Sequence, residues 1–178
     1  MDTSPVVPAT PGTAAAPASL PIAATPNPHY QRLGGHETIV QLVDAFYRAM
    51  DRLPEAATIR AMHAPDLSHT KAVLVAYLSE WTGGPKLYAP LRGAPMLRRR
   101  HQPFDIDASA RDAWMLCMRT AMAEVVADTG LRDELDAAFY KIADFIRNTE
   151  HGGSTRPHPG RPREVAPDLP AAPHSSTA

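Results

Sequence analysis

The sequence is poor in three features that would each define a class of protein. Its 178 residues include one cysteine, Cys117, which excludes an internal disulfide framework and any multi-cysteine zinc or iron–sulfur site. The 18 Lys and Arg residues almost balance the 19 Asp and Glu residues, so no overall positive field indicates nucleic-acid binding. No apolar run approaches the roughly 20 residues that a membrane-spanning helix requires. These absences favour a soluble protein of a reducing compartment, without membrane insertion.

Proline, alanine, serine and threonine dominate both ends of the chain. Residues 1–28 and 151–178 contain few large apolar side chains, so neither segment can bury enough apolar surface to offset the entropy lost on ordering. We therefore expect two disordered tails around one folded domain at residues 29–150. The N-terminal segment also lacks the positive charge and the uninterrupted apolar stretch of a signal peptide, which predicts a cytoplasmic protein.

Apolar residues recur at helical spacing throughout the central domain. Four segments show this pattern: HETIVQLVDAFYRAMDR (36–52), DLSHTKAVLVAYLSEW (66–81), ASARDAWMLCMRTAMAEVVAD (108–128) and LRDELDAAFYKIADFIRN (131–148). In the third segment Ser109 is the expected N-cap, and the fourth is expected to begin after Gly130. Its apolar stripe comprises Leu131, Leu135, Ala138, Ile142 and Phe145. Because no window alternates apolar and polar residues for long, the sequence predicts an all-α domain with four substantial helices.

The stretch MLRRRHQPF, residues 96–104, lies between the second and third of these segments. Pro95 suits the first position of a helix, where its missing N–H has no intrahelical partner. Pro103 disfavours a helical conformation at the residue before it, so the helix should end at about His101. The pattern predicts a helix of about two turns with His101 as its last residue, sharing a face with Leu97.

A histidine in this position admits two interpretations. A neutral imidazole is a good iron ligand, since its second nitrogen can donate to a backbone carbonyl of the preceding turn. Neighbouring arginines could pair with the carboxylates of a planar cofactor, and haem meets both descriptions. On this stretch alone, however, a histidine after an arginine run is more often a surface residue of a solvated helix.

Six landmarks elsewhere favour the haem interpretation. They are YQRLGG, AFYRAMD, IRAMHAPDL, LSEWTGGPKLY, LRRRHQPF and RDAWMLCM. In these pieces and in their order, over about residues 29–149, the chain resembles the group II truncated haemoglobins of the globin superfamily. The resemblance implies a truncated globin fold, in which a sandwich of helices encloses haem b.

The resemblance also implies roles on the proximal side of the haem. His101 would ligate the iron through Nε2. Arg100, and Arg98 as a second candidate, would pair with the propionates. Leu97 would pack under the macrocycle, and Phe104 would close the proximal side.

On the distal side, the resemblance implies that Tyr47 and Trp114 direct hydrogen-bond donors at a bound gas. Without it, both would be interpreted as core aromatics whose polar atoms happen to find partners. His63 matches a position where the family carries Tyr, Phe or His, although the sequence leaves its orientation open. Thr70 falls where larger globins have their distal histidine, with Leu74 one turn later. His69, off the apolar stripe, is expected to face solvent.

The resemblance implies a protein that binds O2 and other diatomic ligands such as NO and CO. Several hydrogen-bond donors suit retention of O2 better than rapid delivery. Oxygen binding or storage is therefore the leading hypothesis, beside O2, NO or peroxide chemistry such as a nitric oxide dioxygenase or peroxidase-like activity, which would require an electron donor. The sequence does not fix the oligomeric state, and a homodimer is compatible with it. The competing hypothesis is a non-haem helical interaction module with disordered proline-rich arms.

Overall fold

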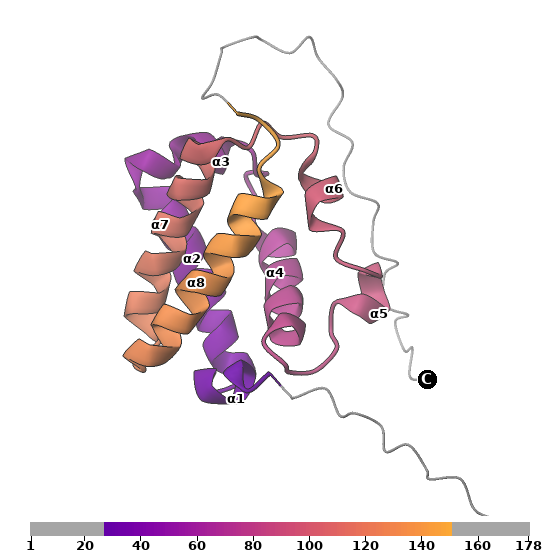
Figure 1. Ribbon diagram of the computed structural model, residues 1–178, viewed down its shortest axis with the longest axis vertical. Coiled ribbons are helices and arrows are strands. Elements are labelled where there is room, and N and C mark those ends of the chain that lie inside the picture. Colours follow the sequence, from indigo (N-terminus) through magenta and orange to yellow (C-terminus); the bar gives the residue numbers. More distant parts are fainter. Residues whose placement is uncertain (1–26, 151–178) are drawn as a thin grey trace, which may run out of the picture.

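The computed structural model describes residues 27–150, so the predicted tails lie outside the described residues. Every regular element in this range is helical (Figure 1). The elements are α1 (His29–Leu33), α2 (His36–Arg52), the 3-10 helix η1 (Pro54–Ala56), α3 (Ala57–Ala61), α4 (Ser68–Trp81), α5 (Ala89–Arg92), α6 (Leu97–His101), α7 (Ala108–Val125) and α8 (Thr129–Ile146). The prediction of an all-α domain with four substantial helices, α2, α4, α7 and α8, is confirmed.

Helix α2 is the centre of the domain, because α7 and α4 both pack against it. Its strong amphipathic pattern explains this position. The side chains that the sequence places on one face are all buried, and they are Ile39, Val43, Phe46, Tyr47 and Met50. Within the described range, no helix is both long and apolar enough to cross a membrane.

Helix α1 docks on the turn that follows α4, which explains the glycine at position 84 of the TGGP motif. The backbone N–H of Tyr30 donates to the carbonyl of Thr82 at 2.9 Å. The Tyr30 ring lies against Gly84 so closely that a Cβ atom there would come within 2.3 Å of a ring carbon. Only glycine fits at Gly84 without a shift of the ring, so the TGGP motif both ends α4 and receives α1.

Aspartates, and not the expected residues, begin the last two long helices. Asp107 caps α7, with its Oδ1 accepting from the backbone N–H of Ala110 at 2.8 Å, while Ser109 donates its hydroxyl to the same carboxylate. Asp128 caps α8 by accepting from the N–H of Leu131 at 3.0 Å. The predicted N-cap at Ser109 and the predicted start after Gly130 are therefore each wrong by two residues, since aspartate satisfies the free N–H groups of a first turn as well as serine does.

Replacement of Asp107 by alanine is expected to lower the free energy of unfolding by about 1 kcal/mol, because a buried cap is lost. The hydrogen bonds from the Ala110 N–H and the Ser109 hydroxyl also hold the pKa of Asp107 below its usual value of 3.8. A lowered pKa in the folded state means that this stabilisation is present above pH 3.8 and is lost as the pH falls through the folded pKa. Urea unfolding at neutral pH and at pH 3 measures both effects. Asp105→Ala, an exposed change two residues earlier, is the control, and equal stability of the two variants would contradict the prediction.

The predicted stripe of α8 is correct only in its first half. Leu131 and Leu135 are buried, but the next buried residues are Phe139 and Ala143. Phe145 is 60% exposed. Helix α8 therefore has apolar residues on two faces, of which one joins the core and the other remains more open at the end that packs against α6.

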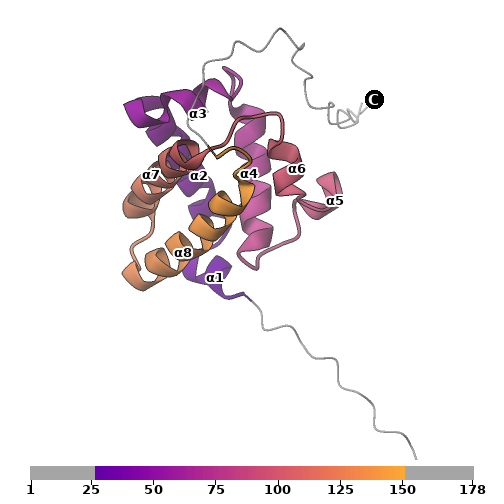
Figure 2. The ribbon, with the colours of Figure 1, turned by 45° about the horizontal axis from the view of Figure 1, so that its top comes forward.

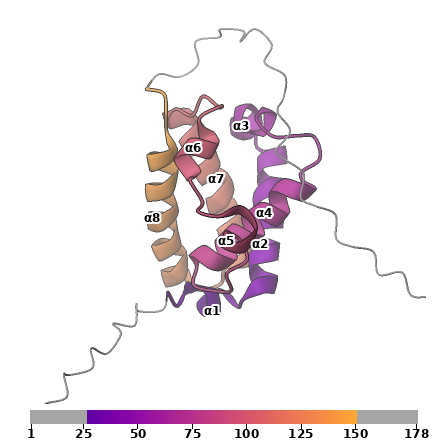
Figure 3. The ribbon, with the colours of Figure 1, turned by 90° about the vertical axis from the view of Figure 1, so that its right-hand side faces the viewer.

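The α5–α6 segment lies on the side of α4 that faces away from α2 (Figures 1 and 2). Viewed from that side, α5 and α6 are nearest the viewer, with α4 and α7 behind them and α8 beside them (Figure 3). The extensive packing of α4 is with α2, and that of α6 is with α8. Helices α4 and α6 are therefore held in place by different neighbours, α2 and α8.

Candidate functional site

His101 is the last residue of α6, as predicted, and its imidazole is half-buried. Its Nδ1 lies 2.7 Å from the carbonyl oxygen of Leu97, one turn earlier. A carbonyl can only accept, so this contact assigns the proton to Nδ1 and leaves the lone pair of Nε2 available. Such an imidazole, with a fixed tautomer and ring orientation, is suited to ligating a metal through Nε2.

The beginning of α6 differs from the prediction. Pro95 precedes the helix, which starts at Leu97 and has five residues in place of two full turns. Met96, the N-cap, adopts a left-handed conformation with φ of 44°, and Gly93 has φ of 69°. A left-handed Met is strained, which is tolerated only where surrounding contacts hold the backbone.

Arg100 supplies those contacts. Its Nε donates to the carbonyl of Pro95 and its Nη2 donates to the carbonyl of Arg92, both at 3.1 Å. The guanidinium therefore holds the carbonyl before Gly93 and the carbonyl before Met96, and it ties the end of α5 to α6. Arg98 lies elsewhere, with its guanidinium carbon 5.8 Å from the centre of the Phe145 ring. Both arginines are exposed at the side of the domain that carries His101.

Asn148, which follows α8, fixes the connection after His101. Its Nδ2 donates to the carbonyls of His101 (3.2 Å) and Phe104 (2.8 Å), and its Oδ1 accepts from the N–H of Ile106. The backbone around the candidate ligand is thus clamped by a residue 47 positions away. Sequence reasoning missed Asn148 because no local pattern indicates which distant carbonyls an amide will reach. Of the other predicted proximal residues, Leu97 is half-buried and Phe104 is 37% exposed.

A continuous set of aromatic rings links α2, α7, α8 and α4. Phe46 contacts both Tyr47 (ring centroids 4.9 Å apart) and Trp114 (5.3 Å), and Phe139 contacts both Trp114 (5.9 Å) and Trp81 (5.0 Å). The contacts of Phe46 with Tyr47 and of Phe139 with Trp114 are edge-to-face, and that of Phe139 with Trp81 is stacked; such contacts fix ring orientation. Within residues 27–150, neither the Tyr47 hydroxyl nor the Trp114 indole N–H has a hydrogen-bond partner. Burial also raises the pKa of Tyr47 well above its usual value, so its phenol remains a neutral donor.

The orientation of His63, open in the sequence, is visible in the structure. Its ring meets Tyr47 edge-on with centroids 5.7 Å apart, and its Nδ1 lies 2.8 Å from the carbonyl oxygen of Ile59. The pKa of His63 is lowered, first by burial and then by the charges of Arg60 and His101, against the opposing effect of the Ile59 hydrogen bond. The structure therefore brings His63 and Tyr47 together.

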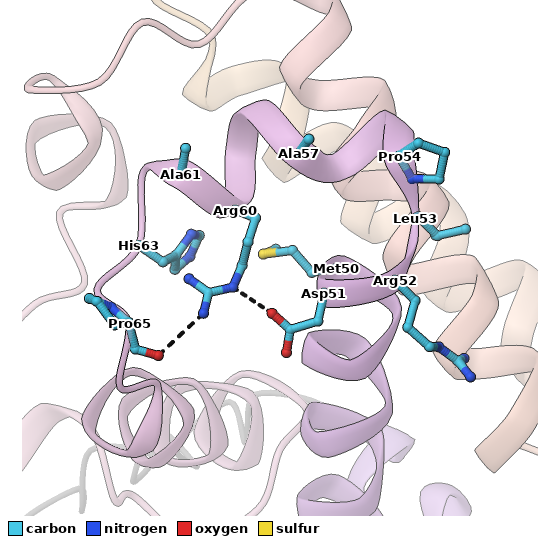
Figure 4. A pocket seen from close by; sticks show the side chains of 10 residues that line it. All are labelled: Met50, Asp51, Arg52, Leu53, Pro54, Ala57, Arg60, Ala61, His63 and Pro65. Carbon is cyan, nitrogen blue, oxygen red and sulfur yellow. Dashed lines mark hydrogen bonds and ion pairs between the residues drawn. The ribbon is translucent and has the colours of Figure 1, made fainter.

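A hollow of about 550 Å³ lies on the outer side of His63, at the junction of α2 and α3 (Figure 4). Arg60 crosses it, with its Nε donating to Asp51 at 2.5 Å and its Nη2 to the carbonyl of Pro65 at 3.2 Å. His63 thus forms part of the wall between solvent and the Tyr47 ring. Arg60 keeps the shape of this wall, since its donors are bound to fixed acceptors.

The α4 positions have less specific surroundings. Thr70 is in the first turn and Leu74 one turn later, and both are half-buried. Leu74 packs against the core together with Tyr77 and Trp81. His69 was expected to face solvent; it is exposed, but its Nε2 lies 3.4 Å from Nη1 of Arg92. Cys117 is fully buried, and burial raises the pKa of its thiol to about 11, consistent with a role in the core.

The described domain is all-helical. It carries a histidine with a fixed tautomer at the end of α6 and aromatic hydrogen-bond donors without a partner on α2 and α7. This is the arrangement of a shortened globin. The sequence profile of the bacterial-like globin family matches residues 28–148. The group 2 truncated haemoglobin YjbI of Bacillus subtilis (strain 168) is 37% identical over 109 residues, covering 61% of this chain and 80% of the relative.

Two solved structures are similar in fold and sequence. The group II 2-on-2 haemoglobin of Agrobacterium tumefaciens has a TM-score of 0.67 at 39% identity, covering 74% of this chain and 100% of that one. The cold-adapted truncated haemoglobin of Pseudoalteromonas haloplanktis TAC125 has a TM-score of 0.67 at 35% identity, covering 68% and 98%.

The chain therefore belongs to the bacterial-like globin family, and within it to the group II truncated haemoglobins. This confirms the resemblance noted in the sequence and the truncated globin fold. It makes the protein a haem-binding globin that takes diatomic gas ligands. Membership in this family does not favour the alternative of a non-haem interaction module.

Proposed function

We propose that this globin holds haem b through His101 and retains O2 with hydrogen bonds from its distal aromatic residues. The observation that carries the proposal is the pairing of His101, whose Nε2 is available, with Tyr47 and Trp114, whose donors have no partner within residues 27–150. Neither atom is among the fully buried polar atoms that lack a partner in this range, so both can reach a small ligand. The donor set therefore fits haem with a small polar ligand.

On the proximal side, His101 would ligate the iron through Nε2. Leu97 and Phe104 would supply apolar contacts on the proximal face of the macrocycle, and Leu74 on α4 would supply one on its distal face. Arg100 and Arg98 are exposed beside His101, where their positive charges favour the haem carboxylates. When bound, the haem supplies the coordination position that a diatomic gas occupies.

On the distal side, Tyr47 and Trp114 donate hydrogen bonds to the gas ligand, and Thr70 adds a hydroxyl at the start of α4. His63 adds a polar group that touches Tyr47 and separates it from the outer hollow. O2 takes on partial negative charge when it binds, so donors preorganised in a low-dielectric space slow its release. This favours oxygen binding or storage, or O2, NO and peroxide chemistry, over rapid delivery.

The test is a visible absorption spectrum of the full chain, purified without haem and then titrated with ferric protohaem. We expect a Soret band that saturates at one haem per chain, and a ferrous form whose spectrum shifts on addition of CO and of O2. As a control, hen lysozyme at the same concentration should produce no such band. A folded protein that stays colourless, or a band that never saturates, would refute haem binding.

A further inference from the structure

Arg92 is the arginine whose surroundings are least explained by the fold. It ends α5, and its Nε is buried without a hydrogen-bond partner. Among residues 27–150 no carboxylate pairs with it, and the nearest side-chain polar group recorded for it is Nε2 of His69, 3.4 Å from its Nη1. An unpaired buried N–H on a charged group is costly, so the site lacks an acceptor.

The position of Arg92 indicates which acceptor is missing. Its backbone carbonyl accepts from Nη2 of Arg100, which ties it to the helix that ends in His101. Its side chain reaches His69 in the first turn of α4. Arg92 therefore contacts residues of both α6 and α4. Figure 3 shows α5, the helix that Arg92 ends, in front of α4.

The other two candidate arginines are more occupied. Arg100 has committed Nε and Nη2 to the carbonyls of Pro95 and Arg92. Arg98 lies over the ring of Phe145. Arg92 has Nε without a partner and no acid beside it, so it offers the planar fork that binds a carboxylate through two N–H groups.

We infer that Arg92, assisted by His69, is the main binding site for one haem propionate, and that Arg100 acts chiefly to position Arg92. This inference rests on the proposed haem binding and extends it to a specific carboxylate contact. A haem between α4 and α6 carries its carboxylates at an edge, and Arg92 with His69 bridges those two helices at an edge. The charges also match, because a guanidinium without a neighbouring carboxylate would bind the negatively charged propionate.

The test measures the rate at which haem leaves the full chain for excess apomyoglobin. It compares protohaem with its dimethyl ester, in which both propionates are esterified and uncharged. We expect Arg92→Met to accelerate loss of protohaem about tenfold, the effect of losing a hydrogen bond to a charged group. Loss of the ester should change less than twofold. Arg99→Met, which removes an exposed charge from α6, is the matched control and should leave both rates unchanged.

His69→Glu provides a second variant at an exposed position, in case Arg92→Met does not fold. A carboxylate there would occupy Arg92, so protohaem loss should accelerate while ester loss does not. If loss of protohaem and loss of the ester accelerate equally, Arg92 has a purely structural role and the inference is wrong. The inference is also wrong if neither rate changes. If inorganic phosphate binds the parent protein at Arg92 while protohaem loss is the same in parent and variant, the site takes free anions and the inference is wrong. Absence of a Soret band in the parent would instead refute the proposed function.

Discussion

Replacing His101 with glycine is expected to abolish the normal ferrous spectrum and to weaken haem retention more than any other single change in the chain. Loss of a partner that only supports a metal ligand costs about 10–100-fold in affinity, so loss of the ligand itself should cost more. The structure also predicts rescue. The hydrogen bond from Nδ1 to the Leu97 carbonyl belongs to the imidazole alone, and glycine leaves a space of the same shape. Free imidazole at millimolar concentration should therefore restore much of the parent spectrum.

The control for this experiment is the other inward-facing histidine. His63 has the same backbone contact, from Nδ1 to the carbonyl four residues earlier, and it is also half-buried. His63→Gly should retain the proximal spectrum and gain nothing from imidazole on that side. The assignment of the iron ligand would move from α6 to the α3–α4 connection if His63→Gly lost the ferrous spectrum while His101→Gly kept it.

The helices of this domain are predictable from sequence because their apolar faces are local patterns. Helix α2 is the clearest example, since its apolar residues have one period and one burial surface, and each predicted core residue is buried. Helix α8 is harder because it carries two apolar faces. Periodicity cannot tell the face that packs against the core at Phe139 from the face that ends in the exposed Phe145. Only the positions of α6 and α7 distinguish them.

Site residues could be predicted from the sequence where the type of side chain itself indicates a role, as for an iron-ligating histidine. They could not be predicted where the role comes only from contacts with residues distant in the sequence. The resemblance assigned His101, Tyr47 and Trp114 from their motifs. Asn148 and Arg92 carry no such signal, because an amide after a helix or an arginine at the end of a short one is common. Their importance comes from contacts with partners 47 and 23 positions away.

The arginines illustrate the same limit. Sequence reasoning associated Arg100 with the cofactor because it precedes His101. The structure shows that its side chain holds the carbonyls of Arg92 and Pro95, which both precede a left-handed Met96, a backbone conformation that no local pattern predicted. Strain beside the site thus explains why an arginine is required there, independently of any carboxylate.

Removing the distal donors is expected to accelerate O2 dissociation by about tenfold for each donor in Tyr47→Phe and in Trp114→Phe. A hydrogen bond to a charged group contributes about 1.5–3 kcal/mol, and 1.4 kcal/mol corresponds to a factor of ten. Tyr47→Phe removes only the hydroxyl, and the edge-to-face contact of the ring with Phe46 remains. Stopped-flow measurement of O2 release gives the rates. CO dissociation should change much less, because CO carries little charge for a donor to stabilise.

Tyr77→Phe is the matched control, because it makes the same change on α4. Tyr77 is half-buried, its ring meets Tyr88 edge-on, and burial raises its pKa to about 12, so its phenol is also a neutral donor. Its O2 release should match that of the parent. If both donors reach the same ligand atom, the double variant will fall short of the product of the single effects, and if they reach different atoms the effects will multiply. Parent-like rates in both single variants would mean that Tyr47 and Trp114 are core aromatics whose polar atoms do not face the ligand.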